Sequence, residues 1–408
     1  MAAVKQVVMG LNGDEAVAYA VKQCNVDVVS AYPITPQTII VERISEFVND
    51  GEVDLEFIKV ESEHSALSAC VGAAAAGART FTATAANGLQ LMHEILYITS
   101  SLRLPVVMAI ANRAPSGPIN IHCDHNDSMG ARDSCWIQIY SEDAQEAYDN
   151  VIQAFRIAEH PDVLLPVMVM MDGFLITHTL QNVSVLDDEA VSKFVGYRRV
   201  DKIEVPAIHG DKKVYRMLNP KYPLTFGPLD LFDYYMEHKM QQIEAMKNAK
   251  RVIKEVHDEY AKLSGRSYGD GFVEPYKADD ADFLLVGLGS TMGTVREVVD
   301  DLRAEGFKVG SVRVRVFRPF PEESLIPLLK DKTAVGILDR GISFGSYGQL
   351  YLDTAAHLYG RMGPILIDFV YGLGGRDMPP SLIKSVFKEV IEAEKNPEPV
   401  LRIRGVRG

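Results

Sequence analysis

The sequence predicts an α/β fold in which parallel strands alternate with helices, followed by a second α/β unit. Over the first 185 residues, short apolar runs alternate with helical patterns, and such alternation produces a parallel sheet with helices on both faces. A charged stretch without regular strands follows over residues 186–275, and the apolar runs then resume. We therefore expect a first domain over 1–185, a connector over 186–275 and a second domain over 276–408.

In the first domain, short apolar runs predict strands, and stretches with apolar residues at helical spacing predict the helices between them. The expected strands are Gln6–Met9, Val26–Ala31, Leu55–Val60, Arg79–Ala85, Leu104–Ala111 and Leu164–Met171. The expected helices are Asp14–Gln23, Pro36–Asn49, Glu63–Ala76, Leu89–Ser100 and Ala144–Ala158. Thr35 and Pro36 are suited to cap the second helix and fill its first turn.

The connector contains one long helical pattern, and the second domain contains four apolar runs. Apolar residues recur near helical spacing from Pro228 to Leu263, with Lys and Glu between them, which predicts a helix packed along a domain. The strands expected in the second domain are Phe283–Gly289, Val309–Val316, Thr333–Asp339 and Ile365–Gly372.

Composition argues against several classes of protein. The 42 basic and 55 acidic residues give a formal charge of -13, which argues against nonspecific binding to nucleic acid or to anionic membranes. No apolar run reaches the ~18 residues that span a bilayer, and the first residues lack the apolar core of a signal peptide. The four cysteines contain no CxxC pair, so an iron–sulfur cluster or zinc ribbon within this chain is not expected. We expect a soluble protein of a reducing cytoplasm.

Polar segments follow three of the predicted strands, at the edge where open α/β sheets bind their ligands. YPITP follows Ala31, ESEH follows Val60, and NRAPSGPINIHCDHND follows Ala111. They place a hydroxyl, a carboxylate and a guanidinium on one edge of the sheet. Each also has a purely structural explanation, as a helix cap, a helix N-terminal charge or a loop anchor. Their shared placement favours a binding site.

Six segments of the chain form a recognisable set: YPITPQT, VESEHSA, RTFTATAANGLQLMHE, RLPVVMAIANRA, PINIHCDHNDS and GLGGRD. Together they resemble the alpha subunit of pyruvate:ferredoxin oxidoreductase and its relatives for other 2-oxo acids, and the resemblance covers nearly the full chain. It implies a pyrimidine-binding domain of the thiamine diphosphate type and a transketolase C-terminal-like domain. The implied reaction is the oxidative decarboxylation of pyruvate with coenzyme A to acetyl-CoA and carbon dioxide, with electrons passed to ferredoxin.

The same resemblance assigns roles to particular residues. Glu63 would hydrogen-bond the thiamine pyrimidine and exchange a proton with it, which a carboxyl group in an apolar pocket can do near neutral pH. Thr35 and Arg113 would bind the carboxylate of the 2-oxo acid, since charge-assisted hydrogen bonds to a carboxylate are strong. Glu61 would be a polar residue at the rim. The remaining cofactor contacts implied by the resemblance are Pro33, Ile34 and Asn87, the last within AANG, where relatives often carry serine and glutamine.

The resemblance also implies partner subunits. Thiamine enzymes hold the diphosphate and its metal through a GDG segment followed some tens of residues later by asparagine. This chain has Gly269–Gly271, but no asparagine lies between Asn248 and Asn396, and this GDG follows no apolar strand; it is expected to be a turn. A beta subunit would then hold the diphosphate with Mg²⁺, and gamma and delta subunits would carry [4Fe-4S] clusters. The subunit alone would be inactive.

Several alternatives stay open. The substrate could be 2-oxoisovalerate or another 2-oxo acid, although PINIHCDHND is closer to the pyruvate-type loop. GLGSTMG imitates the dinucleotide fingerprint of an NAD-binding dehydrogenase, but Met292 stands where its third glycine belongs. A noncatalytic scaffold would tolerate substitution of Glu63, Thr35 and Arg113. Adjacent ligands cannot easily converge on one ion, so no metal is expected at His122–His125. The direction of the reaction, the oxygen tolerance and the copy number are not encoded in these motifs.

Overall fold

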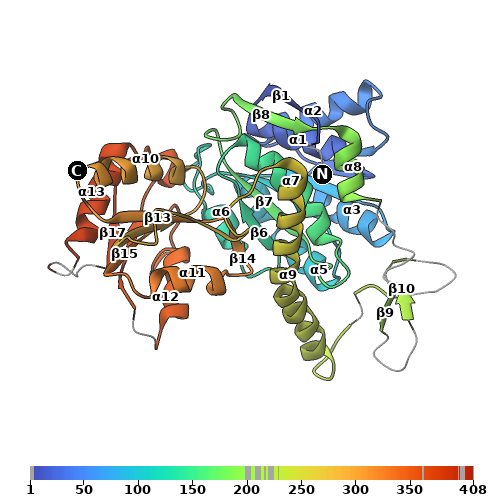
Figure 1. Ribbon diagram of the computed structural model, residues 1–408. Coiled ribbons are helices and arrows are strands. Elements are labelled where there is room, and N and C mark those ends of the chain that lie inside the picture. Colours follow the sequence, from blue (N-terminus) through green and yellow to red (C-terminus); the bar gives the residue numbers. More distant parts are fainter. Residues whose placement is uncertain are drawn as a thin grey trace.

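The computed structural model describes residues 4–197, 204–206, 213–215, 217–218, 225–227, 229–360, 363–393, 395 and 400–407. A larger and a smaller α/β domain lie side by side (Figure 1). The strands of the larger domain are β1 (Gln6–Leu11), β2 (Val28–Ala31), β3 (Glu56–Lys59), β4 (Thr80–Thr84), β5 (Val107–Asn112), β6 (Ile137–Tyr140), β7 (Val167–Asp172) and β8 (Gln181–Leu186). Its helices are α1 (Gly13–Gln23), α2 (Thr38–Asn49), α3 (Glu63–Ala75), α4 (Ala86–Leu91), α5 (His93–Ser101), α6 (Asn126–Gly130), α7 (Ala144–Ala158) and α8 (Asp188–Val195).

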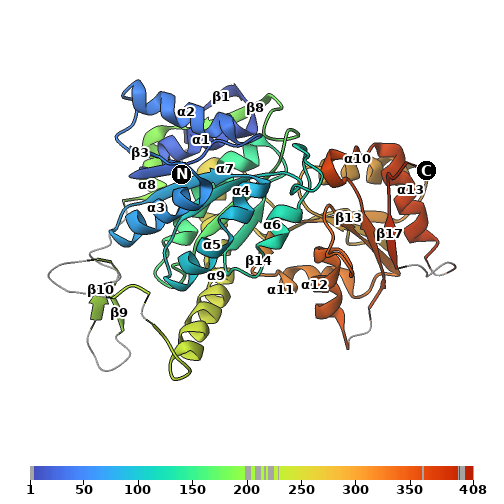
Figure 2. The same cartoon turned by 180° about the vertical axis from the view of Figure 1, so that it is seen from behind.

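The larger sheet has the order β14-β6-β7-β5-β4-β2-β3 and is parallel except for β14 (Val316–Arg318). The predicted parallel α/β class is confirmed. Opposite views show α7 and the long helix α9 (Tyr235–Ser264) over one face of the sheet and α3, α4, α5 and α6 over the other (Figures 1 and 2). The central strands β4, β5 and β7 are buried along their whole length, as parallel strands covered on both faces should be.

Three local expectations for this domain are wrong. β1 does not join the parallel sheet, because it pairs antiparallel with β8 in a separate two-stranded sheet. The single helix expected over Leu89–Ser100 is divided into α4 and α5 at Met92. β6 was not expected at all, since its four residues IQIY form too short a run to stand out from their surroundings.

The smaller domain contains a six-stranded sheet of order β11-β13-β12-β15-β16-β17, in which only β11 is antiparallel. Its strands are β11 (Val273–Tyr276), β12 (Phe283–Gly287), β13 (Val309–Val314), β15 (Ala334–Asp339), β16 (Ile365–Val370) and β17 (Leu401–Ile403). Its helices are α10 (Thr291–Ala304), α11 (Glu322–Leu329), α12 (Gln349–Leu358), the short 3₁₀ helix η2 (Leu373–Gly375) and α13 (Pro380–Ile391).

The connector is less regular than its long helix but not free of strands. The expected helix is present as α9, whose N-terminal end projects from the body of the protein (Figure 1). The expectation that residues 186–275 lack strands is wrong, since β9 (Glu204–Pro206) and β10 (Lys213–Tyr215) form a hairpin and β11 joins the second sheet. Within the described residues, no helix is both long and apolar enough to cross a membrane.

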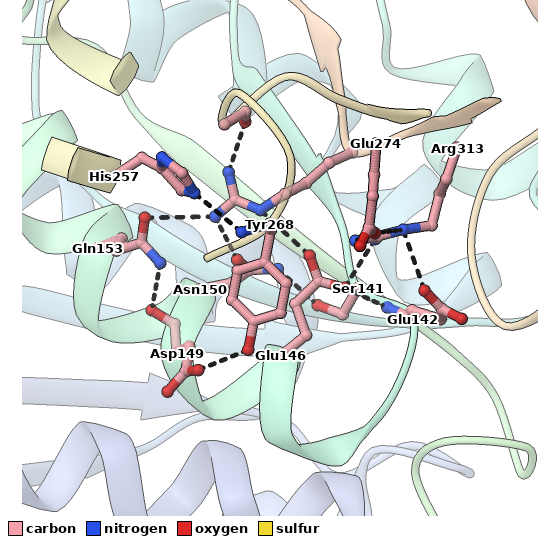
Figure 3. A network of polar contacts seen from close by, with 12 residues as sticks. Ser141, Glu142, Glu146, Asp149, Asn150, Gln153, His257, Tyr268, Glu274 and Arg313 are labelled. Atoms are coloured by element: carbon pink, nitrogen blue, oxygen red, sulfur yellow. Dashed lines mark hydrogen bonds and ion pairs between the residues drawn. The ribbon is translucent and has the colours of Figure 1, made fainter. Parts of the chain in front are cut away.

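One strand path links the two domains. β13 lies in the smaller sheet, and after Arg315 the chain continues as β14, which pairs with β6 of the larger sheet. Arg313 and Arg315 at this crossing are almost fully buried. Arg313 donates to Glu146 of α7 at 2.7 Å and to Glu274 of β11 at 2.7 Å (Figure 3), and Arg315 donates to the other oxygen of Glu146 at 3.1 Å. One carboxylate of the larger domain therefore neutralises two arginines of the crossing strand.

Glu146→Gln should lower the free energy of unfolding by about 3 to 5 kcal/mol, because it leaves the buried guanidinium of Arg315 without its ion-pair partner and removes one countercharge of Arg313. Chemical denaturation of the purified chain measures this. Glu255→Gln, which removes an exposed carboxylate paired with Arg251, is the matched control and should change stability little. Equal effects of the two substitutions would contradict the conclusion that the ion pairs of Glu146 with Arg313 and Arg315 stabilise this region.

Two buried carboxyl groups meet at the start of α12. Asp339 ends β15 and accepts the backbone N–H groups of Leu350 and Tyr351 at 2.9 Å each, while Asp368 of β16 accepts that of Gly348. The second oxygen of Asp368 has no hydrogen-bond partner among the described residues. Burial raises the pKa of both groups, and the charge of Asp368 raises the pKa of Asp339 further.

This pair should make stability fall as pH rises. Because the folded-state pKa values lie above the ordinary carboxyl value of about 4, the folded chain binds more protons than the unfolded chain above that pH. Asp368→Asn removes the negative charge that raises the pKa of Asp339. We expect this variant to exceed the wild type in unfolding free energy by at least about 1 kcal/mol at pH 8 and to match it at pH 5. Urea denaturation at both pH values checks this, with exposed Asp301→Asn as control; a pH-independent difference would contradict it.

Candidate active site

The three polar segments selected from the sequence meet at one edge of the larger sheet. β3, β2, β4 and β5 are neighbouring parallel strands in that order, so the loops that follow them emerge on the same side. Thr35 follows β2, Glu63 follows β3, Asn87 follows β4 and Arg113 follows β5. The sequence expectation of a common edge is therefore met by these four residues.

Arg113 ties the loop after β5 to the turn after β2. Its guanidinium donates through Nη1 to the carbonyl of Thr35 and through Nε to the carbonyl of Asn120, both at 2.9 Å. The residue is only 6% exposed, and it takes part in no ion pair among the described residues. Its third donor, Nη2, makes no hydrogen bond within that part of the chain. Arg113 is thus a loop anchor that keeps an unneutralised positive charge at the site.

The turn that carries Thr35 is held by Gln37 rather than by a helix cap. Gln37 is fully buried, donates to the carbonyl of Ala83 in β4 at 2.9 Å and accepts the N–H of Ile34 at 3.1 Å. α2 begins at Thr38 without a side-chain cap, so the expectation that Thr35 caps this helix is wrong. The side chain of Thr35 is exposed, and its hydroxyl makes no hydrogen bond to the described residues.

Glu63 opens α3 with its carboxylate turned inward. Ser62 caps the helix by accepting the N–H of Ser65 at 3.3 Å. Glu63 is 8% exposed, and its carboxylate makes no hydrogen bond or ion pair within the described residues. It lies against Gly88 of α4, where an added Cβ would stand 2.7 Å from Glu63 Oε1. Only glycine fits beside this carboxylate.

The neighbouring acid has a different environment. Glu61 is exposed, and the hydroxyl of Ser65 donates to its carboxylate. This hydrogen bond lowers the pKa of Glu61. Its position at the surface agrees with the expected rim residue.

The other cofactor contacts expected from the sequence lie around the same edge. Asn87 is exposed and accepts the N–H of Ser116 at 3.0 Å, which joins α4 to the loop after β5. Pro33 is exposed and Ile34 is half-buried. Pro33 also lines a cavity of about 580 Å³ between α2 and β3. Glu63, Thr35 and Arg113 do not line this cavity, so it is separate from the candidate site.

The loop 113–125 is clamped by the smaller domain. The side chain of Asn120 donates to the carbonyl of Gly374 at 2.9 Å, and Gly374 N–H donates to Asp124. Gly375 packs against His122 so closely that a Cβ would not fit. The carbonyl of Asn120 also accepts a hydrogen bond from Arg113. Asn120 therefore connects the GLGG turn of the smaller domain to Arg113.

The segment His122–His125 does not form a four-ligand metal cluster. The ring of His122 lies against Phe174, whereas His125 Nε2 is 2.7 Å from Asp172 Oδ1 at the end of β7. Sulfur and nitrogen atoms of Cys123 and His125 do approach an Asp172 oxygen within 4.8 Å. However, Arg340 donates to Asp172 at 3.0 Å, and a guanidinium there disfavours a second cation.

Asp172 instead joins the two domains. Burial alone would raise its pKa, but the charges of His125 and Arg340 hold the pKa of this carboxyl well below its usual range. Ser290, at the start of α10, donates to it through its N–H at 3.1 Å. A Cβ at Gly289 would stand 2.9 Å from the carboxylate. The GLGSTMG segment is therefore occupied by a domain contact, which argues against its use as a dinucleotide loop.

The sequence reasoning missed three residues that shape this edge: Gln37, Asn112 and Asp127. Asp127 accepts the backbone N–H of Arg113 at 2.9 Å and that of Ala86 at 3.0 Å. Such residues carry no signal in a single sequence, since a buried amide or carboxylate is noticed only when its partners are known. The only sequence feature near Asp127 was its place in the polar run DHNDS, Asp124 to Ser128.

Two family models match most of the chain. Residues 19–258 match the family described as pyruvate flavodoxin/ferredoxin oxidoreductase, thiamine diP-bdg, and residues 281–383 match pyruvate:ferredoxin oxidoreductase core domain II. Pyruvate synthase subunit PorA of Thermotoga maritima is 54% identical over 94% of both chains. PorA of Methanocaldococcus jannaschii is 50% identical over 94% of this chain and 95% of its own. Ketoisovalerate oxidoreductase subunit VorA of Pyrococcus abyssi is 42% identical over 96% and 95%.

Two solved structures share the fold. A 2-oxoglutarate:ferredoxin oxidoreductase from Magnetococcus marinus has a TM-score of 0.70 at 20% identity, over 94% of this chain and 65% of the other. A split-gene transketolase has a TM-score of 0.52 at 13% identity, over 94% and 99%. Both likenesses agree with the thiamine-type and transketolase-like fold expected from the sequence.

Proposed function

This chain belongs to the pyruvate:ferredoxin oxidoreductase family, and on that basis we propose that it is the alpha subunit of an enzyme that oxidises pyruvate. In the proposed reaction, pyruvate and coenzyme A give acetyl-CoA and carbon dioxide, and the electrons go to ferredoxin. One observation supports this most. Within the described part of the chain, the nearly buried carboxylate of Glu63 has no partner, and it shares a sheet edge with the guanidinium of Arg113, which takes part in no ion pair.

The residues around Glu63 fit the pyrimidine half of thiamine diphosphate. The free carboxylate can accept a hydrogen bond from a ring nitrogen that carries a proton, and Gly88 leaves the space beside it clear of a side chain. Bound thiamine diphosphate supplies a nucleophilic carbon and an electron sink for decarboxylation. Glu63 would hold a proton at its carboxylate and exchange it with the ring, as general acid and base. Pro33, Ile34 and Asn87 are the proposed flanking contacts.

The substrate would be held by groups that the protein leaves unused. Arg113 Nη2 has no partner in the described part of the chain, and the Thr35 hydroxyl is exposed and equally free. Both can donate to the carboxylate of a 2-oxo acid, and a charged partner makes such hydrogen bonds short and strong. Because Arg113 also fixes the Thr35 carbonyl, the two donors would be held at a constant separation.

The contacts of Asp270 support the proposal of partner subunits. Its carboxylate accepts the N–H groups of Phe272 and Val273 at 2.9 Å and the hydroxyl of Ser324 at 2.5 Å, so this GDG is the expected turn and is already engaged. We propose that a beta subunit holds the diphosphate with Mg²⁺. Gamma and delta subunits with [4Fe-4S] clusters would pass electrons to ferredoxin. The four unpaired cysteines support a cytoplasmic location.

Pyruvate is preferred among the 2-oxo acids. The pyruvate synthase relatives reach 54% and 50% identity, against 42% for the ketoisovalerate relative. 2-Oxoisovalerate is the second candidate because that relative still covers nearly the whole chain. An NAD-binding role receives no support, since Ser290 of the glycine-rich segment is bonded to Asp172.

Glu63→Gln should abolish pyruvate-dependent ferredoxin reduction by the assembled complex, by at least about 100-fold in kcat, because an amide cannot exchange the proton. The substitution is isosteric, so the melting temperature should stay close to that of the wild type. Glu61→Gln, two residues away and exposed, is the matched control and should keep most of the activity.

The isolated wild-type chain should reduce no dye with pyruvate, because it lacks the proposed diphosphate and cluster subunits. Near-native turnover by the Glu63→Gln complex would remove the catalytic assignment and favour a scaffold. Dye reduction by the chain alone would contradict the proposal that other subunits bind the diphosphate and carry the clusters.

Arg113→Met should lower kcat/KM for pyruvate by about 30-fold to 1000-fold, equivalent to the roughly 2 to 4 kcal/mol lost with one preorganised stabilising group. Steady-state kinetics of the complex measure this, and added guanidinium ion should restore part of the rate. Arg132→Met is the control, since Arg132 is half-buried and, like Arg113, donates to a carbonyl, that of Met129. If both variants fell equally without rescue, Arg113 would be a loop anchor alone.

A further inference from the structure

We infer that Asp127 is the positioning residue that fixes the distance between the two halves of the proposed site. One half is the loop of Arg113, and the other is the turn into α4 that leads to Asn87 and Gly88. The inference rests on the proposed function, because it concerns the groups assigned there to substrate and cofactor.

A single oxygen of Asp127 joins both halves. Oδ2 accepts the backbone N–H of Arg113 at 2.9 Å and the backbone N–H of Ala86 at 3.0 Å. These two N–H groups follow β5 and β4, which are adjacent in the sheet. Asp127 itself belongs to α6, so a residue of neither strand links the two strand ends.

The second oxygen is used as completely as the first. Oδ1 accepts the side-chain amide of Asn112 at 2.8 Å and the N–H of Ser128 at 2.7 Å. Burial raises the pKa of Asp127 to about 6, while the N–H groups of Arg113 and Asn112 oppose that rise. The group is therefore a carboxylate at neutral pH, with four N–H donors and no exposed surface.

The turn into α4 needs such a restraint. Ala86 has a φ of 38°, in a region that residues with a Cβ adopt only when their surroundings hold them there. Two residues later, Gly88 lies against the carboxylate of Glu63 with no room for a Cβ. A shift of the turn would therefore change the surroundings of Glu63, whereas a shift at Arg113 would move the cation.

Asp127→Asn in the assembled complex tests the inference. Asparagine keeps the shape but replaces one acceptor oxygen with an NH₂ group, which faces N–H donors and leaves at least two of them unpaired. We expect the KM for pyruvate and the Kd for thiamine diphosphate, measured by equilibrium dialysis, each to rise about tenfold, equivalent to about 1.4 kcal/mol. A purely structural role would lower stability without moving these two constants.

Val151→Ala is the control for lost stability. Val151 is fully buried in α7, on the opposite face of the sheet from α4, and its truncation leaves a core cavity. This variant should unfold more easily but keep both constants. Values for Asp127→Asn within twofold of the wild type, or equal shifts in both variants, would overturn the inference.

A second substitution separates the two halves. In Asp127→Asn combined with Ala86→Gly, glycine takes the positive φ without strain. The Kd for thiamine diphosphate should return toward the wild-type value because glycine relaxes the turn into α4, whereas the KM for pyruvate should stay raised because this substitution does not act on the loop of Arg113. Equal recovery of both constants would overturn the inference.

If Asp127→Asn does not assemble, Asn112→Leu provides the same test, since it removes one donor that orients the carboxylate. Both constants should then rise by about threefold, from the loss of one such hydrogen bond, and unchanged constants would overturn the inference. The wild-type complex separates the two levels of the argument. Absence of pyruvate turnover there contradicts the proposed function, whereas a fully active wild type with unaffected variants contradicts only the role of Asp127.

Discussion

The parallel pairing of β2, β3, β4 and β5 is the constraint on which the proposed site depends. Side-by-side parallel strands bring the segments after Ala31, Lys59, Thr84 and Asn112 to one edge, although these segments are spread over more than eighty residues of sequence. Among the described residues, the carboxylate of Glu63 and one guanidinium donor of Arg113 then have no partner at this edge. Buried charges are costly unless they are paired, so their lack of partners is what suggests a ligand that supplies the missing hydrogen bonds.

Two groups of buried charges near this edge show the opposite behaviour, because their members are paired with one another. Glu146 forms ion pairs with Arg313 and Arg315 where the strand crosses between the sheets. Asp172 binds His125, Ser290 and Arg340 where the loops of the two domains meet. Buried ion pairs contribute little net stability but strongly penalise any arrangement that separates them. They therefore fix how the domains dock, and through Asn120 and the GLGG turn this docking reaches Arg113.

Oxygen-rich segments that resemble ligand sites are used here for structure. The carboxylate of Asp270 in the GDG turn is consumed by backbone N–H groups, and the glycine-rich segment before α10 lies against Asp172. A motif is a site only when its donors or acceptors remain free. By that criterion neither the GDG turn nor the glycine-rich segment before α10 is a site, because the polar groups of both are already bonded within the chain.

The sequence alone determined the α/β class, the parallel strands and the places where polar segments leave them, because hydrophobic periodicity and strand ends are local properties. The motifs around Thr35, Glu63 and Arg113 were visible for the same reason. Only the tertiary structure decided that β1 pairs with β8, that β14 joins the larger sheet, that Gln37 rather than Thr35 holds the turn before α2, and that one oxygen of Asp127 joins two strand ends. Each of these depends on contacts between residues far apart in the chain, and no spacing within one segment encodes such a contact.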